Sequence, residues 1–128
     1  MTSHRFYIYS LFILAGMFGL AGGLLSQGQA TSPAPANSVI VLPMKGAIGP
    51  ALSGYLDEGL QKAADDNAAL VLIELDTPGG LLTTTREMTQ SIINSEVPVA
   101  VYVTPAGAHA ASAGTFIMYS AHIAAMAE

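Results

Sequence analysis

The stretch LVLIELDTPGG, from Leu70 to Gly80, decides how this chain folds. Its first six residues form a nearly continuous apolar run, which is typical of a buried strand in a parallel sheet. The stretch ends in two consecutive glycines, Gly79 and Gly80, whose lack of a side chain lets backbone amides approach a ligand closely. The sequence therefore predicts a buried strand that is followed by a glycine turn at one edge of a sheet.

Strands and helices are predicted to alternate on both sides of this stretch. Further strands are expected at Val39–Leu42 and Val97–Val103, and a fourth begins at His122–Met126. Three helices are expected between the strands, beginning near Pro50, Leu81 and Ser112. This alternation predicts an α/β domain over residues 39–128, with parallel strands that are covered on both faces.

The first thirty residues do not fit this domain. The segment Phe6–Leu25 carries no charge, follows His4 and Arg5, and leads to a sequence with small residues where signal peptidase prefers them. Residues 1–30 are predicted to be a cleaved signal peptide or, as the alternative, a retained membrane anchor, because the run is long enough to span a bilayer. Residues 31–38 have the composition of a linker. Both alternatives place the domain on the extracytoplasmic side, membrane-associated or exported.

Charge and composition exclude several functions. The 128-residue chain has a net charge of −5, and only three basic side chains remain beyond residue 30. That balance argues against nucleic acid and against anionic lipid as direct partners. The chain has no cysteine, which excludes disulfides and thiolate metal sites. Its three histidines lack metal-ligand spacing with carboxylates, so neither a metal nor a cofactor is expected.

Ser112 is the residue that most strongly suggests chemistry. It lies among small residues at the start of the third predicted helix, where the Ala113 N–H lacks a helical partner and the helix dipole favours negative charge. Loops that follow parallel strands meet at the carboxyl edge of the sheet, so Ser112 and the glycine turn are expected close together. Ser112 is therefore predicted to be a nucleophile whose oxyanion is bound by Ala113 and by Gly79 or Gly80. The alternative is that Ser112 is only a helix N-cap.

Other polar residues are given smaller roles. Asp76 is expected to hold the glycine turn by accepting backbone N–H bonds. Lys45 is the only lysine that the topology could bring near Ser112, although a surface lysine after a strand is ordinary. His109 is expected to be an exposed loop residue, and His122 to lie too far from Ser112 to act as its base.

Two blocks of sequence together resemble the ClpP-class membrane serine proteases. They are DTPGGL, residues 76–81, and AASAGT, residues 110–115. Within that class the chain resembles the nodulation-efficiency protein D (NfeD) family, which residues 41–50 and 98–107 also resemble. The resemblance covers nearly the whole chain after Asn37. It implies a ClpP/crotonase-like spiral of ββα units, of which residues 39–128 would form the N-terminal part.

The same resemblance implies an activity. The family is one of serine endopeptidases with a Ser–Lys dyad that cleave apolar segments near the membrane, including those of stomatin-like partners, and a homo-oligomer is expected. By this resemblance Ser112 is the nucleophile, and Gly79 or Gly80 with Ala113 supplies the oxyanion hole. The general-base lysine would lie a few dozen residues beyond the serine, past Glu128, so the chain alone would hold half of a dyad and lack activity.

Two other functions stay open at this point. One is a truncated, non-catalytic binding or assembly module of the same family. The other is a crotonase-type acyl-CoA enzyme, which would use paired amides to stabilise a thioester enolate. An export signal argues against this second alternative, because CoA thioesters are cytoplasmic substrates.

Overall fold

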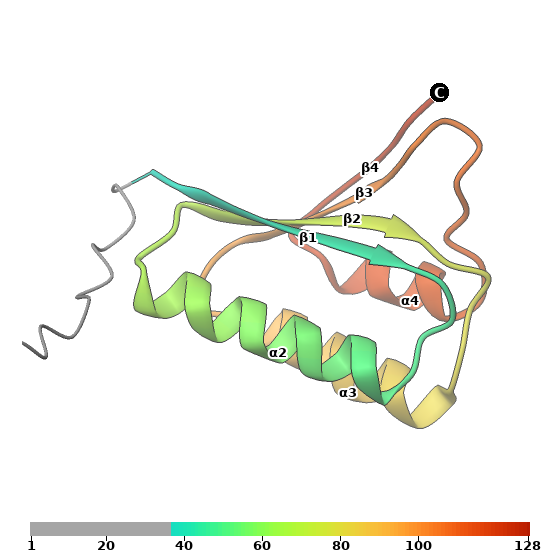
Figure 1. The fold of residues 1–128 in the computed structure, drawn as a ribbon, viewed down its shortest axis with the longest axis horizontal. Coiled ribbons are helices and arrows are strands. Elements are labelled where there is room, and N and C mark those ends of the chain that lie inside the picture. The colour runs from blue at the N-terminus through green and yellow to red at the C-terminus, as the bar shows by residue number, and fades with distance from the viewer. Residues whose placement is uncertain (1–36) are drawn as a thin grey trace, which may run out of the picture. The chain divides into compact units, whose positions relative to one another are not determined.

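A computed structural model describes residues 37–128, which form a parallel sheet packed on three helices (Figure 1). The strands lie in the order β1-β2-β3-β4, and their bounds are β1 (Val39–Lys45), β2 (Leu70–Asp76), β3 (Val99–Val103) and β4 (Ile123–Met126). The helices that connect them are α2 (Pro50–Asp65), α3 (Leu82–Ile93) and α4 (Ala113–Ser120). The predicted alternation of parallel strands and helices is confirmed for these residues.

The predicted signal peptide or anchor at residues 1–30 lies outside the described residues, as does most of the predicted linker at residues 31–38. Among the helices in residues 37–128, none is long and apolar enough to cross a membrane.

All three helices lie on the same face of the sheet (Figure 1). Strands that follow one another in sequence are also neighbours in space, so crossovers of one hand place every connecting helix on one side. The prediction that the strands are covered on both faces is therefore wrong within residues 37–128. On β1, Leu42 and Met44 are buried against the helices, whereas Val41 on the opposite face is 46% exposed.

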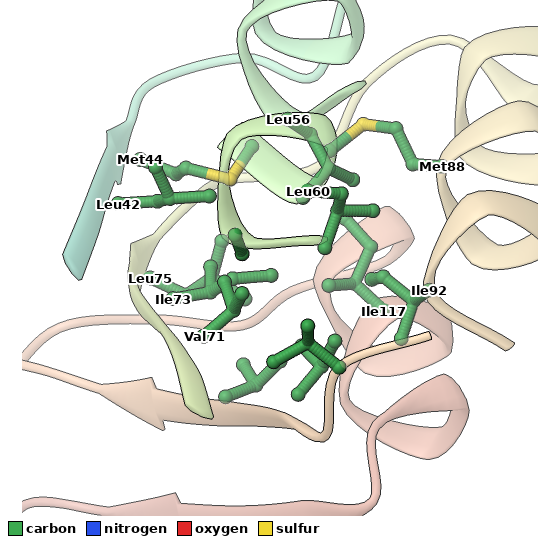
Figure 2. Packing of buried hydrophobic residues seen from close by; sticks show 14 of the residues in the cluster. Leu42, Met44, Leu56, Leu60, Val71, Ile73, Leu75, Met88, Ile92 and Ile117 are labelled. Atoms are coloured by element: carbon green, nitrogen blue, oxygen red, sulfur yellow. The ribbon is translucent and has the colours of Figure 1, made fainter. Parts of the chain in front are cut away.

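The hydrophobic core lies between the sheet and the helices (Figure 2). It is built from strand residues Leu42, Met44, Val71, Ile73 and Leu75 and from helix residues Leu56, Leu60, Met88, Ile92 and Ile117. Burying one side chain of this size stabilises the fold by roughly 1.5–3 kcal/mol. Because the core fixes both the strands and the helix starts, it also fixes the loops that join them at the carboxyl edge.

Strand β1 is longer than predicted, since it continues through Pro43 to Lys45. Proline has no N–H to donate and is tolerated in edge strands. Within residues 37–128, β1 pairs only with β2 and forms the edge of the sheet, so Pro43 does not interrupt a central ladder there. As a result, Lys45 and Asp76 end their strands side by side, in register with each other.

Candidate active site

Two loops meet at the carboxyl edge of the sheet. One follows β2 and contains Thr77 and the two glycines, and the other follows β3 and leads to Ser112. The Thr77 N–H donates to the His109 carbonyl at 2.7 Å, and the Ala111 N–H donates to the Thr77 carbonyl at 3.1 Å. These bonds form a parallel bridge between Thr77 and Ala110. The main chain itself therefore joins the glycine turn to the segment that carries Ser112, residues 104–112, which we call the serine loop.

Ser112 is exposed and directly precedes α4, in a backbone conformation that serine rarely adopts. Its φ is 49° and its ψ is −107°. Such a conformation costs of order 1–3 kcal/mol, and residues of this kind cluster at active sites. The Ser112 side chain makes no capping hydrogen bond to α4. Ser112 occupies the N-cap position of α4, as the alternative expected, but capping does not account for its hydroxyl.

The two glycines are required for different steric reasons. Gly79 has a φ of +116°, and a Cβ there would lie 2.8 Å from the Cβ of Ser112 and 3.3 Å from its Oγ. Gly80 faces the other way, where a Cβ would lie 2.1 Å from the Ile48 carbonyl oxygen. Ile48 and Gly80 form a second parallel bridge. The turn can therefore contact both Ser112 and the segment after β1 only because neither residue has a side chain.

The backbone N–H groups near Ser112 are of two kinds. The Gly79 N–H donates to Thr77 Oγ1 at 3.0 Å. By contrast, the N–H groups of Gly80 and Ala113 make no hydrogen bond to any residue in the described range. The Ala113 N–H also lies at the start of α4, where the helix dipole favours an anion. Among the three predicted oxyanion donors, Gly80 and Ala113 are available, whereas Gly79 is occupied.

Thr77 is a site residue that the sequence analysis does not single out. It is fully buried, and its Oγ1 donates to the Gly79 carbonyl at 3.2 Å as well as accepting the Gly79 N–H. Its Cγ2 lies against Gly114, where an added Cβ would be 2.7 Å away. The available signal is its position, because threonine just after a strand and before Pro-Gly often bonds the backbone two residues on.

Asp76 holds the serine loop and not the glycine turn, which corrects the prediction. Its Oδ1 accepts the His109 N–H at 3.2 Å, and its Oδ2 lies 3.3 Å from Lys45 Nζ. The His109 N–H bond and the Lys45 ammonium together hold the pKa of Asp76 below its ordinary value. Consecutive residues of an extended chain direct their side chains to opposite faces, so Thr77 reaches the turn and Asp76 does not.

None of the basic side chains within residues 37–128 forms a hydrogen bond with Ser112. His122 lies at the far end of β3, where its Nδ1 accepts the Val99 N–H at 3.1 Å, in agreement with its predicted distance. Lys45 Nζ is paired with Asp76 Oδ2 at 3.3 Å and not with Ser112. His109 is exposed in the serine loop, as predicted.

A hollow of about 340 Å³ lies beside the serine loop. It is lined by Asp76, Pro78, His109 and Ala111. The residue immediately before Ser112 is thus part of its wall, and the hollow offers space for a ligand beside the serine loop.

The described residues form part of a ClpP-like fold. A ClpP1 from Listeria monocytogenes matches with a TM-score of 0.55 over 63% of this chain and 46% of that chain, at 21% identity, a likeness that concerns the fold alone. Residues 38–128 match the family model of the NfeD1b N-terminal domain. The chain therefore belongs to the NfeD1b family, which confirms the resemblance read from the sequence.

Relatives of known name cover the same part of the chain. The membrane-bound protease PH1510 of Pyrococcus horikoshii is 44% identical over 91 residues, or 71% of this chain. The membrane protein NfeD1b of Bacillus subtilis is 33% identical over 93 residues, or 73% of this chain. In both cases the match spans 21% of the relative, so the chain corresponds to about a fifth of these proteins.

Solved structures show the same relationship. A serine-to-alanine mutant of the 1510-N membrane-bound stomatin-specific protease matches with a TM-score of 0.70 at 41% identity, over 73% of this chain and 45% of that chain. A lysine-to-alanine mutant of that protease, in complex with a substrate peptide, matches with a TM-score of 0.70 at 42% identity. That second match covers 73% of this chain and 42% of the other.

Proposed function

We propose that this chain carries the nucleophile and the oxyanion hole of a ClpP-class serine endopeptidase. One observation carries the proposal: the strained, exposed and uncapped Ser112 contacts the glycine turn, and within the described residues the N–H groups of Gly80, in that turn, and of Ala113, the next residue, have no hydrogen-bond partner. The names of the relatives, which include a membrane-bound protease, support the same class.

The proposed reaction is acyl transfer to Ser112 followed by hydrolysis. The Oγ attacks the carbonyl carbon of a peptide bond, and its proton passes to a lysine that lies outside residues 37–128. The carbonyl oxygen becomes an anion that accepts from Gly80 and Ala113, and loss of one such donor typically slows turnover by about 10²–10³. The C–N bond then breaks, the amine leaves with the proton, and water hydrolyses the acyl ester.

We further propose that the substrates are apolar, extended segments near the membrane, with a stomatin-like protein as the partner. The support is that the solved relative is named a stomatin-specific protease and that one of its structures is a complex with a substrate peptide. An extended peptide can add to the edge of a sheet through its main chain. The proposal includes a homo-oligomer whose protease domain lies on the extracytoplasmic side, as expected from the sequence.

A non-catalytic binding module is the second candidate. The observation in its favour is that no described side chain is bonded to Ser112 as a base, and that Lys45 is engaged by Asp76. In that case the free N–H groups would bind a peptide carbonyl or carboxylate without covalent chemistry.

Labelling with an alkyl fluorophosphonate separates the two candidates. The full-length wild-type protein is expected to gain one phosphonyl group on Ser112, identified by peptide mass spectrometry, and the Ser112→Ala variant to gain none. Ser95→Ala is the matched control, because Ser95 lies in the loop before β3 and uses its hydroxyl to bond Val97. Absence of labelling in the wild type, or equal labelling of Ser112→Ala, would contradict the protease proposal.

A further inference from the structure

Three segments meet at one carboxylate beside the site. Asp76 ends β2, Lys45 ends β1, and His109 belongs to the serine loop. The Asp76 carboxylate uses one oxygen for the His109 N–H at 3.2 Å and the other for Lys45 Nζ at 3.3 Å. We call these three residues the Asp76 cluster.

The Asp76 cluster adds one side-chain hydrogen bond to the two backbone hydrogen bonds that join the glycine turn and the serine loop. The Thr77 N–H bonds the His109 carbonyl, and the Ala111 N–H bonds the Thr77 carbonyl. The Asp76 Oδ1 adds a third bond, to the His109 N–H, on the same short segment. Of the three, only this bond comes from a side chain, so it can be removed by mutation while the backbone bridge remains.

The position of this bond matters for the serine. His109 lies three residues before Ser112, and Ala111 directly precedes it. Ser112 is already strained, with its Cβ close to Gly79, so the serine loop must be held against the turn. A misplacement of about 1 Å at a reacting group can slow a reaction about 10²-fold.

We propose that Asp76 is a positioning residue, whose carboxylate fixes the serine loop so that Ser112 Oγ stays aligned with the N–H groups of Gly80 and Ala113. Lys45 orients the carboxylate and is not the base. This inference rests on the proposed function of Ser112. It assigns to Asp76 an effect on the rate of attack at Ser112 and not on ligand binding.

The hollow beside the serine loop provides the competing explanation. Asp76 and His109 also line it, so Asp76 could instead touch a bound ligand. The two roles differ in kinetics, because a positioning residue changes the limiting rate of reaction while a wall residue changes affinity.

The test measures inactivation of the full-length protein by an alkyl fluorophosphonate at several concentrations, which yields a limiting rate and an inhibition constant. For Asp76→Ala the limiting rate is expected to fall about tenfold or more, in line with the loss of a hydrogen bond to a charged group, at an unchanged inhibition constant. Asp76→Asn keeps an acceptor for the His109 N–H and should lie between Asp76→Ala and the wild type. Lys45→Met should change the rate about twofold or less, as expected for an exposed ion pair.

Hydrogen exchange gives a readout that does not depend on catalysis. The His109 amide should exchange faster in Asp76→Ala than in the wild type, and Asp76→Asn should restore much of its protection. The matched control is Asp66→Asn, which breaks the Lys62–Asp66 pair of 2.6 Å at the end of α2, away from the site. This control should alter neither the His109 exchange nor the labelling rate.

Three results would overturn the role of Asp76. One is that the His109 amide of Asp76→Ala exchanges at the wild-type rate. Another is that this amide exchanges faster in Asp76→Ala while the limiting rate of inactivation by the fluorophosphonate stays at the wild-type value. The third is a raised inhibition constant at an unchanged limiting rate, which would make Asp76 a wall of a binding site. A wild-type protein that is not labelled would instead overturn the proposed function, and the role of Asp76 with it.

Discussion

Within the described part of the chain, serine and histidine side chains occur at both the amino and the carboxyl edge of the parallel sheet, but Ser95 and Ser112 differ in whether their hydroxyl groups are hydrogen-bonded to the backbone. At the amino edge, Ser95 Oγ donates to the Val97 carbonyl at 2.7 Å and accepts the Val97 N–H at 3.3 Å, and His122 accepts the Val99 N–H. At the carboxyl edge, Ser112 makes no capping bond and is held in a strained conformation. At the amino edge, the Ser95 hydroxyl is used in hydrogen bonds that stabilise the backbone. At the carboxyl edge, the backbone holds Ser112 in a conformation in which its hydroxyl makes no capping bond.

The largest expected effect comes from crowding Ser112. In Gly79→Ala the new Cβ would lie 2.8 Å from the Ser112 Cβ, so the fluorophosphonate labelling rate is expected to fall about 100-fold or more. Gly46→Ala is the control, because Gly46 also has a positive φ, +103°, but has open space around it. Both variants should lose about 1–3 kcal/mol in urea unfolding from backbone strain. Equal labelling rates for the two would show that the contact with Ser112 does not matter.

The next effect concerns the support beneath the glycine turn. Thr77→Val keeps the shape of the side chain but leaves the Gly79 N–H without its Oγ1 acceptor, so the free energy of unfolding should fall by about 1–3 kcal/mol. Thr77→Ser retains the hydroxyl and should recover most of this loss. Thr85→Val is the control in α3, where the Leu81 carbonyl keeps its bond from the Thr85 N–H at 2.9 Å. A loss as large in Thr85→Val would contradict a special role for Thr77.

A smaller effect is expected at the amino edge. Ser95→Ala removes the hydroxyl that serves both polar groups of Val97, which should lower the free energy of unfolding by about 1 kcal/mol. Labelling of Ser112 should proceed at the wild-type rate. A slower labelling rate in this variant would contradict the view that the amino edge has a structural role and only the carboxyl edge is reactive.

The smallest effect is a pH dependence at Asp76. Its pKa is lowered from an ordinary value near 3.8 in the folded state, by the His109 N–H and by Lys45. Its stabilisation is therefore present above pH 3.8 and is lost as the pH falls through the lower, folded-state pKa. The difference in urea midpoint between wild type and Asp76→Asn should accordingly be largest near neutral pH and shrink below pH 3.8. A difference that grows in acid would contradict the lowered pKa.

Much of the fold could be predicted from the sequence, because the apolar runs and helical spacings are strong local signals. The strand that begins at Leu70 and the helix that follows Ser112 are examples. The uncovered face of the sheet could not be predicted, because an apolar run such as Val39–Leu42 does not say in which order the strands lie, and that order decides whether the helices cover one face or both. The end of β1 was also mispredicted, because the strand was expected to end just before Pro43. A proline is accommodated within a strand chiefly where that strand lies at an edge of the sheet, which the sequence does not reveal.

The residues that meet at the site could be predicted from the sequence, but the hydrogen bonds between them could not. Topology alone brings Ser112 and the glycine turn to one edge. Which N–H groups stay free depends on the Thr77 side chain, whose buried hydroxyl engages Gly79 and leaves Gly80 available. The partner of Asp76 depends in turn on the face to which its side chain points, which only the geometry at the end of β2 decides.

The most direct test of the account is a crystal structure of the full-length protein phosphonylated on Ser112. The phosphonyl oxygen stands for the oxyanion, and we predict it within about 2.7–3.1 Å of the N atoms of Gly80 and Ala113. The Gly79 N–H should still donate to Thr77 Oγ1. A phosphonyl oxygen bonded to Gly79, or one that accepts from neither Gly80 nor Ala113, would contradict the proposed oxyanion hole.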